Sequence, residues 1–125
     1  MATKRVKPLQ TRTVARRAVQ FAADKKAVDI VLLDMRKVTD IADYFLICTG
    51  VVDAHVRAIV DNIDHELSQL GWEPRHVEGR TQNRWVLVDY VDIIVHVLQP
   101  DARGYFAIER LWGDAARVKV KGVTD

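Results

Sequence analysis

The spacing of apolar residues along the chain predicts three amphipathic helices. Apolar positions recur every three to four residues over 13–27, 53–70 and 101–112, which places them on one face of a helix. Residues that commonly end helices flank these segments: Thr13, Asp53 and Asp101 as N-caps and Gly71 as a left-handed C-cap. Each helix is therefore expected to cover another layer of the protein with its apolar face.

Shorter apolar runs between these helices predict strands. The candidate strands are 29–34, 43–49, 84–89 and 92–98, with a weaker one at 75–78. Only Tyr90 and Val91 separate two of them, which predicts an antiparallel hairpin. The strand–helix–strand unit at 43–78 instead favours parallel strands. The expected fold class is α/β, with a mixed five-stranded sheet flanked by helices.

Charge divides the chain into a basic start and an acidic remainder. Residues 1–26 hold eight basic side chains and one acidic one, whereas the remaining residues carry eleven basic and sixteen acidic side chains. We interpret 1–12 as a flexible basic arm, 13–114 as the domain and 115–125 as a C-terminal tail. A basic arm can contact RNA phosphates, and an acidic body favours a basic protein partner. A charged terminus that only improves solubility is an equal alternative.

Composition favours a cytoplasmic protein. Apolar runs are all shorter than the roughly 18 residues that span a bilayer, and Cys48 is the single cysteine, which excludes an internal disulfide. The acid-free start, rich in Arg and Ala, keeps organellar targeting as a minor alternative.

The residues that could carry catalysis do not form a catalytic set. Asp89 and Asp92 stand three positions apart across the predicted hairpin turn, whereas two carboxylates that share a metal from one strand need an even spacing. The four histidines lack the spacing of a zinc site, and Gly50 alone falls short of a phosphate-binding loop. We expect His96 to be a satisfied core histidine and Cys48 a buried, inert thiol. The pattern favours a binding protein without cofactor or metal over an enzyme.

Two tryptophans are candidates for different roles. Trp85 opens a strand beside Arg84, which predicts an exposed or edge position. Aromatic residues beside arginines are frequent anchors of protein interfaces. Trp112 ends an amphipathic helix and is expected to pack on the sheet. Trp85 is therefore the first candidate for a partner contact.

Six strings of the sequence, taken in order, resemble the ribosomal silencing factor family, also called Iojap-related proteins. The strings are DIVLLDM, TDIADYFLICTG, AHVRAIVDNI, GWEP with the following EG, RWVLVDYVDIIVHVL and YFAIERLWGDA. They cover residues 13–114, nearly the whole predicted domain. Their succession is specific, although each string alone is weak.

The resemblance implies a fold related to nucleotidyltransferases but without their catalytic residues. It implies binding to the large ribosomal subunit through a basic ribosomal protein on the intersubunit face, which blocks joining of the small subunit and represses translation under nutrient limitation. It also implies a homodimer of the free protein. Alternatives are a large-subunit assembly factor, as for organellar relatives, a nucleotide-handling enzyme on the related fold, and a dimeric scaffold with no ribosomal role. The basic arm is a candidate for contact with ribosomal RNA.

The resemblance also carries a candidate contact surface over to this chain. Its residues are Trp85, Asp89, Tyr90, Asp92, His96, Tyr105, Arg110, Leu111 and Trp112, with Asp43, Tyr44, Gly50 and His55 from the first strings. Two departures from the family pattern matter. Val51 and Val52 replace small hydroxyl residues, which weakens phosphate binding at Gly50. Val91 replaces a glycine, and because a β-branched residue resists positive φ, we expect a different turn there.

Overall fold

The structure, a computed structural model, describes residues 10–106 and 108–124. Its helices are α1 (Thr11–Asp24), α2 (Asp53–Gln69), α3 (Pro100–Phe106) and α4 (Ile108–Leu111). Its strands are β1 (Val28–Asp34), β2 (Tyr44–Thr49), β3 (His76–Glu78), β4 (Trp85–Asp89), β5 (Ile93–Leu98) and β6 (Ala116–Arg117). The expected order of helices and strands up to β5 is confirmed.

The strands form one mixed sheet in the order β3-β4-β5-β2-β1-β6. β2 and β5 pair in parallel, and the remaining neighbours pair antiparallel. The mixed α/β fold is confirmed, but the sheet has six strands rather than the predicted five. The extra strand, β6, lies in the segment expected to be a tail, and the same segment buries Val118 and Val120 in the core. Residues 115–124 are therefore part of the folded domain.

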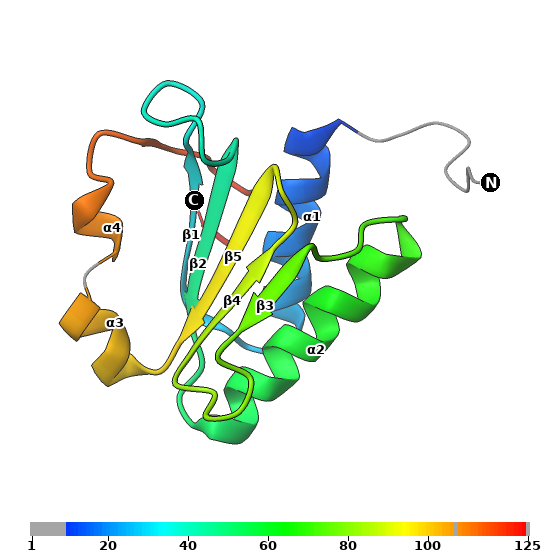
Figure 1. The fold of residues 1–125 in the computed structure, drawn as a ribbon, viewed down its shortest axis with the longest axis vertical. Helices are drawn as coiled ribbons and strands as arrows, with labels where there is room; N and C mark the ends of the chain where they lie inside the picture. Colours follow the sequence, from blue (N-terminus) through cyan, green and yellow to red (C-terminus); the bar gives the residue numbers. More distant parts are fainter. Residues whose placement is uncertain (1–9, 107, 125) are drawn as a thin grey trace.

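Helices cover the two faces of the sheet unequally (Figure 1). α1 and α2 pack side by side on one face, where their apolar residues join alternate residues of β2, β4 and β5 in the larger buried cluster. α3 and α4 lie on the other face beside a smaller cluster that includes Phe45, Ile94 and Leu98. The second face is covered less completely, and the candidate site lies there.

Helix ends differ in detail from those that the sequence predicts. α1 and α2 begin after Gln10 and Val52, neither of which caps through its side chain, so Thr13 and Asp53 are not the N-caps. The last predicted helix is divided into α3 and α4, and α3 begins at Pro100, one residue before the predicted cap Asp101. Proline suits the first helical position because its missing N–H has no partner there in any helix. Gly71 has φ 86°, which confirms the left-handed end of α2.

Candidate partner-binding surface

The side chains of β4 are buried on one face of the sheet and partly accessible on the other. Val86 and Val88 are buried against the helices α1 and α2, whereas Trp85, Leu87 and Asp89 point to the opposite face and are half-buried. This alternation follows from the period of two in a strand. Because Trp85 and Leu87 are only half-buried, β4 keeps accessible apolar surface on the face that also carries α3 and α4 (Figure 1).

Four rings gather beside this open part of the sheet. The Trp85 indole Nε1 donates to Nδ1 of His96 at 3.1 Å. The His96 ring lies edge-on to Phe45 with centroids 5.0 Å apart, and Phe45 in turn contacts Trp112 edge-on at 5.9 Å. Such edge-to-face arrangements fit the quadrupoles of the rings. We call Trp85, His96, Phe45 and Trp112 the aromatic cluster.

His96 is buried, as expected of a core histidine, but only one of its two ring nitrogens has a hydrogen-bond partner in the structure. The residue is 5% exposed, and burial lowers the pKa of its imidazole to about 4. Because Nδ1 accepts from Trp85, the neutral ring carries its proton on Nε2, which is buried without a hydrogen-bond partner in the structure. The bond orients the Trp85 indole, which is half-buried at the start of β4, where the strand pairs with β5 but not with β3, so the expected edge position is confirmed.

The end of α4 adds an exposed apolar side chain next to Trp112. Leu111 is 75% exposed, and the neighbouring Arg110 is also exposed, whereas Trp112 is half-buried against the smaller cluster, as predicted for packing on the sheet. The candidate Tyr105 belongs to α3, and its side chain lies outside the described residues. Aromatic rings and arginines are frequent anchors of protein interfaces, and the exposed leucine adds apolar surface beside them.

A second group of candidates lies at the β4–β5 turn. Asp89 accepts from Arg75 Nη2 at 2.7 Å and from the Val91 amide at 2.7 Å. Partial burial opposes its ionisation, but these donors outweigh burial and hold the pKa of Asp89 below its usual value. Asp92 is exposed, and its carbonyl accepts from the amides of Asp43 and Tyr44. These contacts make both aspartates parts of the turn.

The turn itself corrects the expectation for Val91. Its φ is 75°, and the Asp92 amide donates to the Tyr90 carbonyl at 2.9 Å across it. This is a tight three-residue turn, which a β-branched residue adopts only at a cost. The Tyr90 amide also donates to Ile93, and the Asp89 carboxylate holds the Val91 amide. The surrounding hydrogen bonds therefore fix the positive φ despite the valine.

Tyr90 and Tyr44 are core residues in this structure. Tyr90 is 3% exposed, and its hydroxyl donates to Asp64 of α2 at 2.9 Å. Burial first, and then the Asp64 carboxylate, raise the pKa of Tyr90. Tyr44 is 1% exposed, and the Arg36 guanidinium lies 5.5 Å from its ring centroid. Their packing faces the helices α1 and α2, so neither joins the aromatic cluster.

Gly50 lies in the loop that connects β2 to α2, and His55 lies in the first turn of α2. His55 accepts from the Val51 amide through Nδ1, and its Nε2 pairs with the Lys25 carbonyl at 2.8 Å. A Cβ on Gly50 would lie 2.8 Å from the Val56 amide nitrogen, so glycine is needed for close approach to α2. These contacts explain both residues as parts of the folded structure, without a phosphate ligand.

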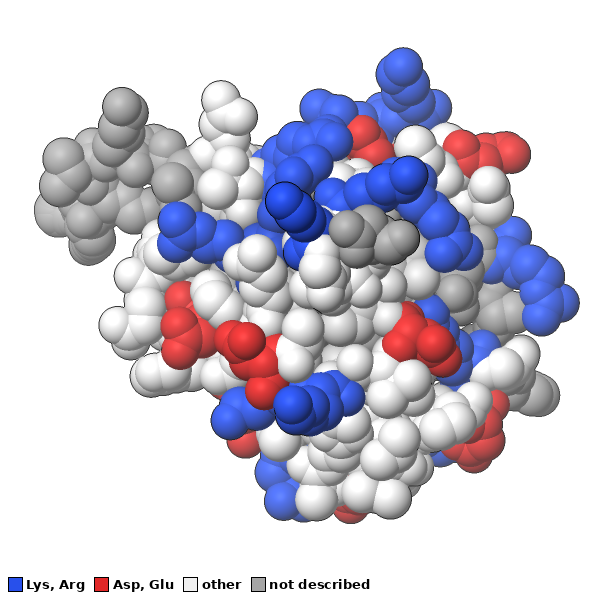
Figure 2. Space-filling model, turned by 180° about the vertical axis from the view of Figure 1, so that it is seen from behind, with Lys and Arg blue, Asp and Glu red and all other residues white. Residues whose placement is uncertain are grey.

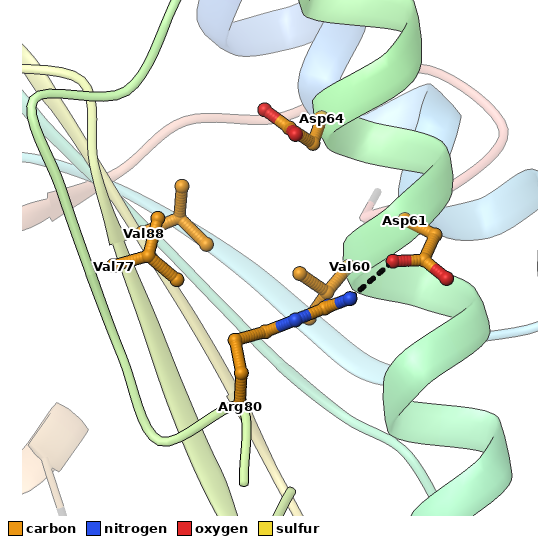
Figure 3. A pocket seen from close by; sticks show the side chains of 6 residues that line it. All are labelled: Val60, Asp61, Asp64, Val77, Arg80 and Val88. Carbon is orange, nitrogen blue, oxygen red and sulfur yellow. Dashed lines mark hydrogen bonds and ion pairs between the residues drawn. The ribbon is translucent and has the colours of Figure 1, made fainter.

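A small pocket between α2 and the β3–β4 region has Asp61 and Asp64 of α2 in its lining (Figure 3). Its volume is about 120 Å³, and Val60, Val77 and Val88 form its apolar wall. Arg80 extends across it to an ion pair with Asp61. The described residues contain no group of three or more His, Cys, Asp or Glu side chains able to hold a metal ion. Cys48 of β2 is fully buried, and burial raises the pKa of its thiol to about 12.

Sequence reasoning missed two residues of the open face. Phe45 links His96 to Trp112, and Leu87 pairs across the hairpin with His96. The position of Leu87 could have been predicted from the sequence, because residues of β4 that alternate with Val86 and Val88 must share the opposite face. The contact between Phe45 and His96 depends on the register of the parallel pair β2 and β5. The pattern of apolar residues does not predict that register.

The fold defines a mixed α/β domain with two half-buried tryptophans, Trp85 and Trp112, on one face of its sheet. The family described as ribosomal silencing factor during starvation, RsfS, matches residues 8–125, and the chain belongs to this family. A relative from Halalkalibacterium halodurans named ribosomal silencing factor RsfS is 43% identical over 106 residues, which cover 85% of this chain and 91% of that protein. The Bacillus subtilis protein of the same name is 41% identical over 107 residues, which cover 86% of this chain and 91% of that protein.

More distant relatives and solved structures agree with this assignment. A mouse protein named mitochondrial assembly of ribosomal large subunit protein 1 is 25% identical and covers 75% of this chain, which spans 42% of that protein. A crystal structure of a Chromobacterium violaceum protein matches with a TM-score of 0.82 at 29% identity, covering 93% of this chain and 96% of that one. No helix among the described residues is long and apolar enough to cross a membrane.

Proposed function

We propose that the protein binds the large ribosomal subunit at the intersubunit face and blocks joining of the small subunit, which represses translation under nutrient limitation. One observation carries the proposal: an aromatic cluster whose two tryptophans, Trp85 and Trp112, are half-buried, in a chain of the ribosomal silencing factor family. The names of its relatives support action on the ribosome. A folded domain that occupies the intersubunit face excludes the small subunit by its volume.

The partner that suits this surface is a basic ribosomal protein. Apolar rings at the centre supply binding energy once water is excluded, and charged residues at the rim supply orientation. Arg84 and Asp101 form such a rim beside Trp85, with nitrogen and oxygen 3.4 Å apart. The acidic excess beyond residue 26 adds long-range attraction to a basic partner.

The direct test is the affinity of tryptophan variants for purified large subunits. Trp85→Ala removes the anchor, and we expect a loss of at least about 2 kcal/mol in binding, near thirtyfold in Kd. Trp72→Ala is the matched control, because Trp72 is also half-buried but packs against the opposite cluster. Equal losses in both variants, or unchanged binding of folded Trp85→Ala, would contradict the assignment of the surface.

A role in assembly of the large subunit is the second candidate. The name of the mouse relative favours it. The two functions separate when the protein is depleted from growing cells. Accumulation of large-subunit precursors indicates assembly, whereas normal subunits with excess joining under starvation indicate silencing.

We infer further that the protein is not a nucleotide-transferring enzyme. Asp89 is engaged by Arg75 and the Val91 amide rather than facing Asp92 across an open site. Metal-dependent nucleotide transfer that disappears in a folded Asp89→Asn variant would overturn this inference. Cytoplasmic location and a homodimer of the free protein stay predictions, the latter to be measured by analytical sedimentation.

A further inference from the structure

The segment after α4 presents a row of cations on the outside of the domain. Arg117, Lys119 and Lys121 are exposed, and they alternate with Val118 and Val120, which are buried in the larger cluster. The Val118 amide also donates to the Leu32 carbonyl of β1 at 2.8 Å. The buried valines therefore hold the three cations in a fixed, outward-facing row along the end of the sheet.

Neighbouring elements add three arginines to this row. β6 pairs with β1 so that Ala116 lies opposite Asp34. The Asp34 carboxylate contacts Arg36 at 2.7 Å and Arg12 of α1 at 3.9 Å, which brings both arginines to the start of the row. Arg16 is exposed one turn further along α1, on the same side as Arg12.

We call these six residues the cationic edge: Arg12, Arg16, Arg36, Arg117, Lys119 and Lys121. Figure 2 shows Lys and Arg side chains gathered in the upper part of the face that contains α1 and the C-terminal segment. Asp34, the carboxylate that the contacts place among them, is 16% exposed and already paired with Arg36. Asp43 also acts on Arg36 electrostatically, but cations still outnumber these two carboxylates at the edge, although the chain beyond residue 26 is acidic overall.

We propose that the cationic edge binds the phosphate backbone of double-helical RNA. This inference rests on the proposed function and adds a second contact to it, with ribosomal RNA as the partner. Alternate residues of an extended segment lie about 6.7 Å apart, a spacing comparable to that of successive phosphates along a strand. Arginine and lysine at such positions bind by displacing condensed counterions. The alternating residues are buried valines, so the row offers no apolar wedge for insertion into a lipid surface.

The cationic edge and the aromatic cluster can act at the same time. Four strand-to-strand steps separate β6 from β4 in the sheet, which amounts to about 19 Å. A ribosomal protein on β4 and an adjacent RNA helix on β6 would therefore not compete for the same surface. The cationic edge consists of residues of the folded domain, which would therefore have an RNA-binding side of its own.

The test uses the full chain and a labelled RNA hairpin with a fully paired stem, titrated between about 50 and 200 mM salt. Lys119→Gln/Lys121→Gln removes two charges of the row. The matched control, Arg57→Gln/Arg80→Gln, removes two exposed cations of α2 and the β3–β4 region. We expect the first pair to weaken binding about tenfold at low salt and to reduce the slope of log affinity against log salt by up to about 2. The control pair should change both much less.

Equal effects of the two pairs, or no measurable binding of the hairpin, would overturn the proposal. So would loss of binding to vesicles with anionic lipid in the first pair while hairpin binding is unchanged. The same proteins are then measured on purified large subunits. If the wild type fails to bind subunits but shows hairpin binding that depends on Lys119 and Lys121, the proposed function fails and the RNA site stands.

Discussion

Val91 shows how the structure tolerates an unfavourable residue when its neighbours fix the backbone. Its φ of 75° lies in the left-handed region, and its side chain is 46% exposed, so the valine gains little from burial. The Asp89 carboxylate accepts from the Val91 amide, and the Ile93 carbonyl accepts from the Tyr90 amide. The cost of the conformation is therefore offset by hydrogen bonds rather than by packing.

Replacing this valine with glycine should stabilise the protein. Val91→Gly relieves a strain of about 1–2 kcal/mol and loses part of that gain to the greater freedom of glycine in the unfolded chain. We expect a net increase of about 0.5–1 kcal/mol in the free energy of unfolding, measured with urea. Val51→Gly is the control, since Val51 is similarly exposed but lacks a positive φ; it should destabilise. A loss of stability in Val91→Gly would show that the turn is not strained.

His96 should make stability depend on pH in a defined window. Burial lowers its pKa from 6.5 to about 4 in the folded state, so the unfolded chain binds more protons between these values. The free energy of unfolding is complete above about pH 6.5 and falls as the pH drops toward 4, by about 3 kcal/mol at most. Asp34 and Asp89, whose pKa values are lowered from 3.8, lose their contribution only at lower pH.

The measurement compares urea unfolding at several pH values for the wild type and for His96→Phe. The variant keeps an aromatic ring beside Phe45 but cannot titrate, so its stability should change much less between pH 6.5 and 4.5 even if it starts lower. Parallel profiles for the two proteins would contradict the assignment of this dependence to His96.

At the scale of elements, the sequence predicts those with long regular patterns and misses those that depend on tertiary contacts. α1, α2 and the strands β1, β2, β4 and β5 follow from their periodicity. β6 has two residues in a charged segment, and its pairing with β1 exists only because α1 and the sheet provide a cluster for Val118 and Val120. The sequence also indicates Trp85 and Trp112 as candidates, but not that Phe45 joins them, because that contact requires the order of the strands.

The C-terminal segment should contribute directly to stability. Val118→Ala/Val120→Ala removes buried side chains that are 5% and 3% exposed, and we expect a loss of about 2–4 kcal/mol in the free energy of unfolding. Lys119→Ala, which lies between them and is exposed, should change stability by less than about 0.5 kcal/mol. Equal stability of the double variant and the wild type would mean that the segment is a tail after all.

At the scale of the whole molecule, positive charge is concentrated in the basic arm and in the cationic edge. Their contributions to the affinity for RNA should add. Deleting residues 1–9 removes Lys4, Arg5 and Lys7, and the salt dependence of large-subunit binding should flatten by up to about 3 in log–log slope. Binding to an isolated basic ribosomal protein should stay the same or tighten, because a repelling segment is gone. Loss of that binding on deletion would locate recognition in the arm rather than in the domain.

The account depends on the claim that this domain, seated through its aromatic cluster, keeps the ribosomal subunits apart. Light scattering during mixing of purified small and large subunits measures this most directly. We predict that stoichiometric wild-type protein abolishes the increase in scattering, that Trp72→Ala does the same, and that Trp85→Ala permits joining. Normal joining in the presence of wild-type protein bound to the large subunit would contradict the account.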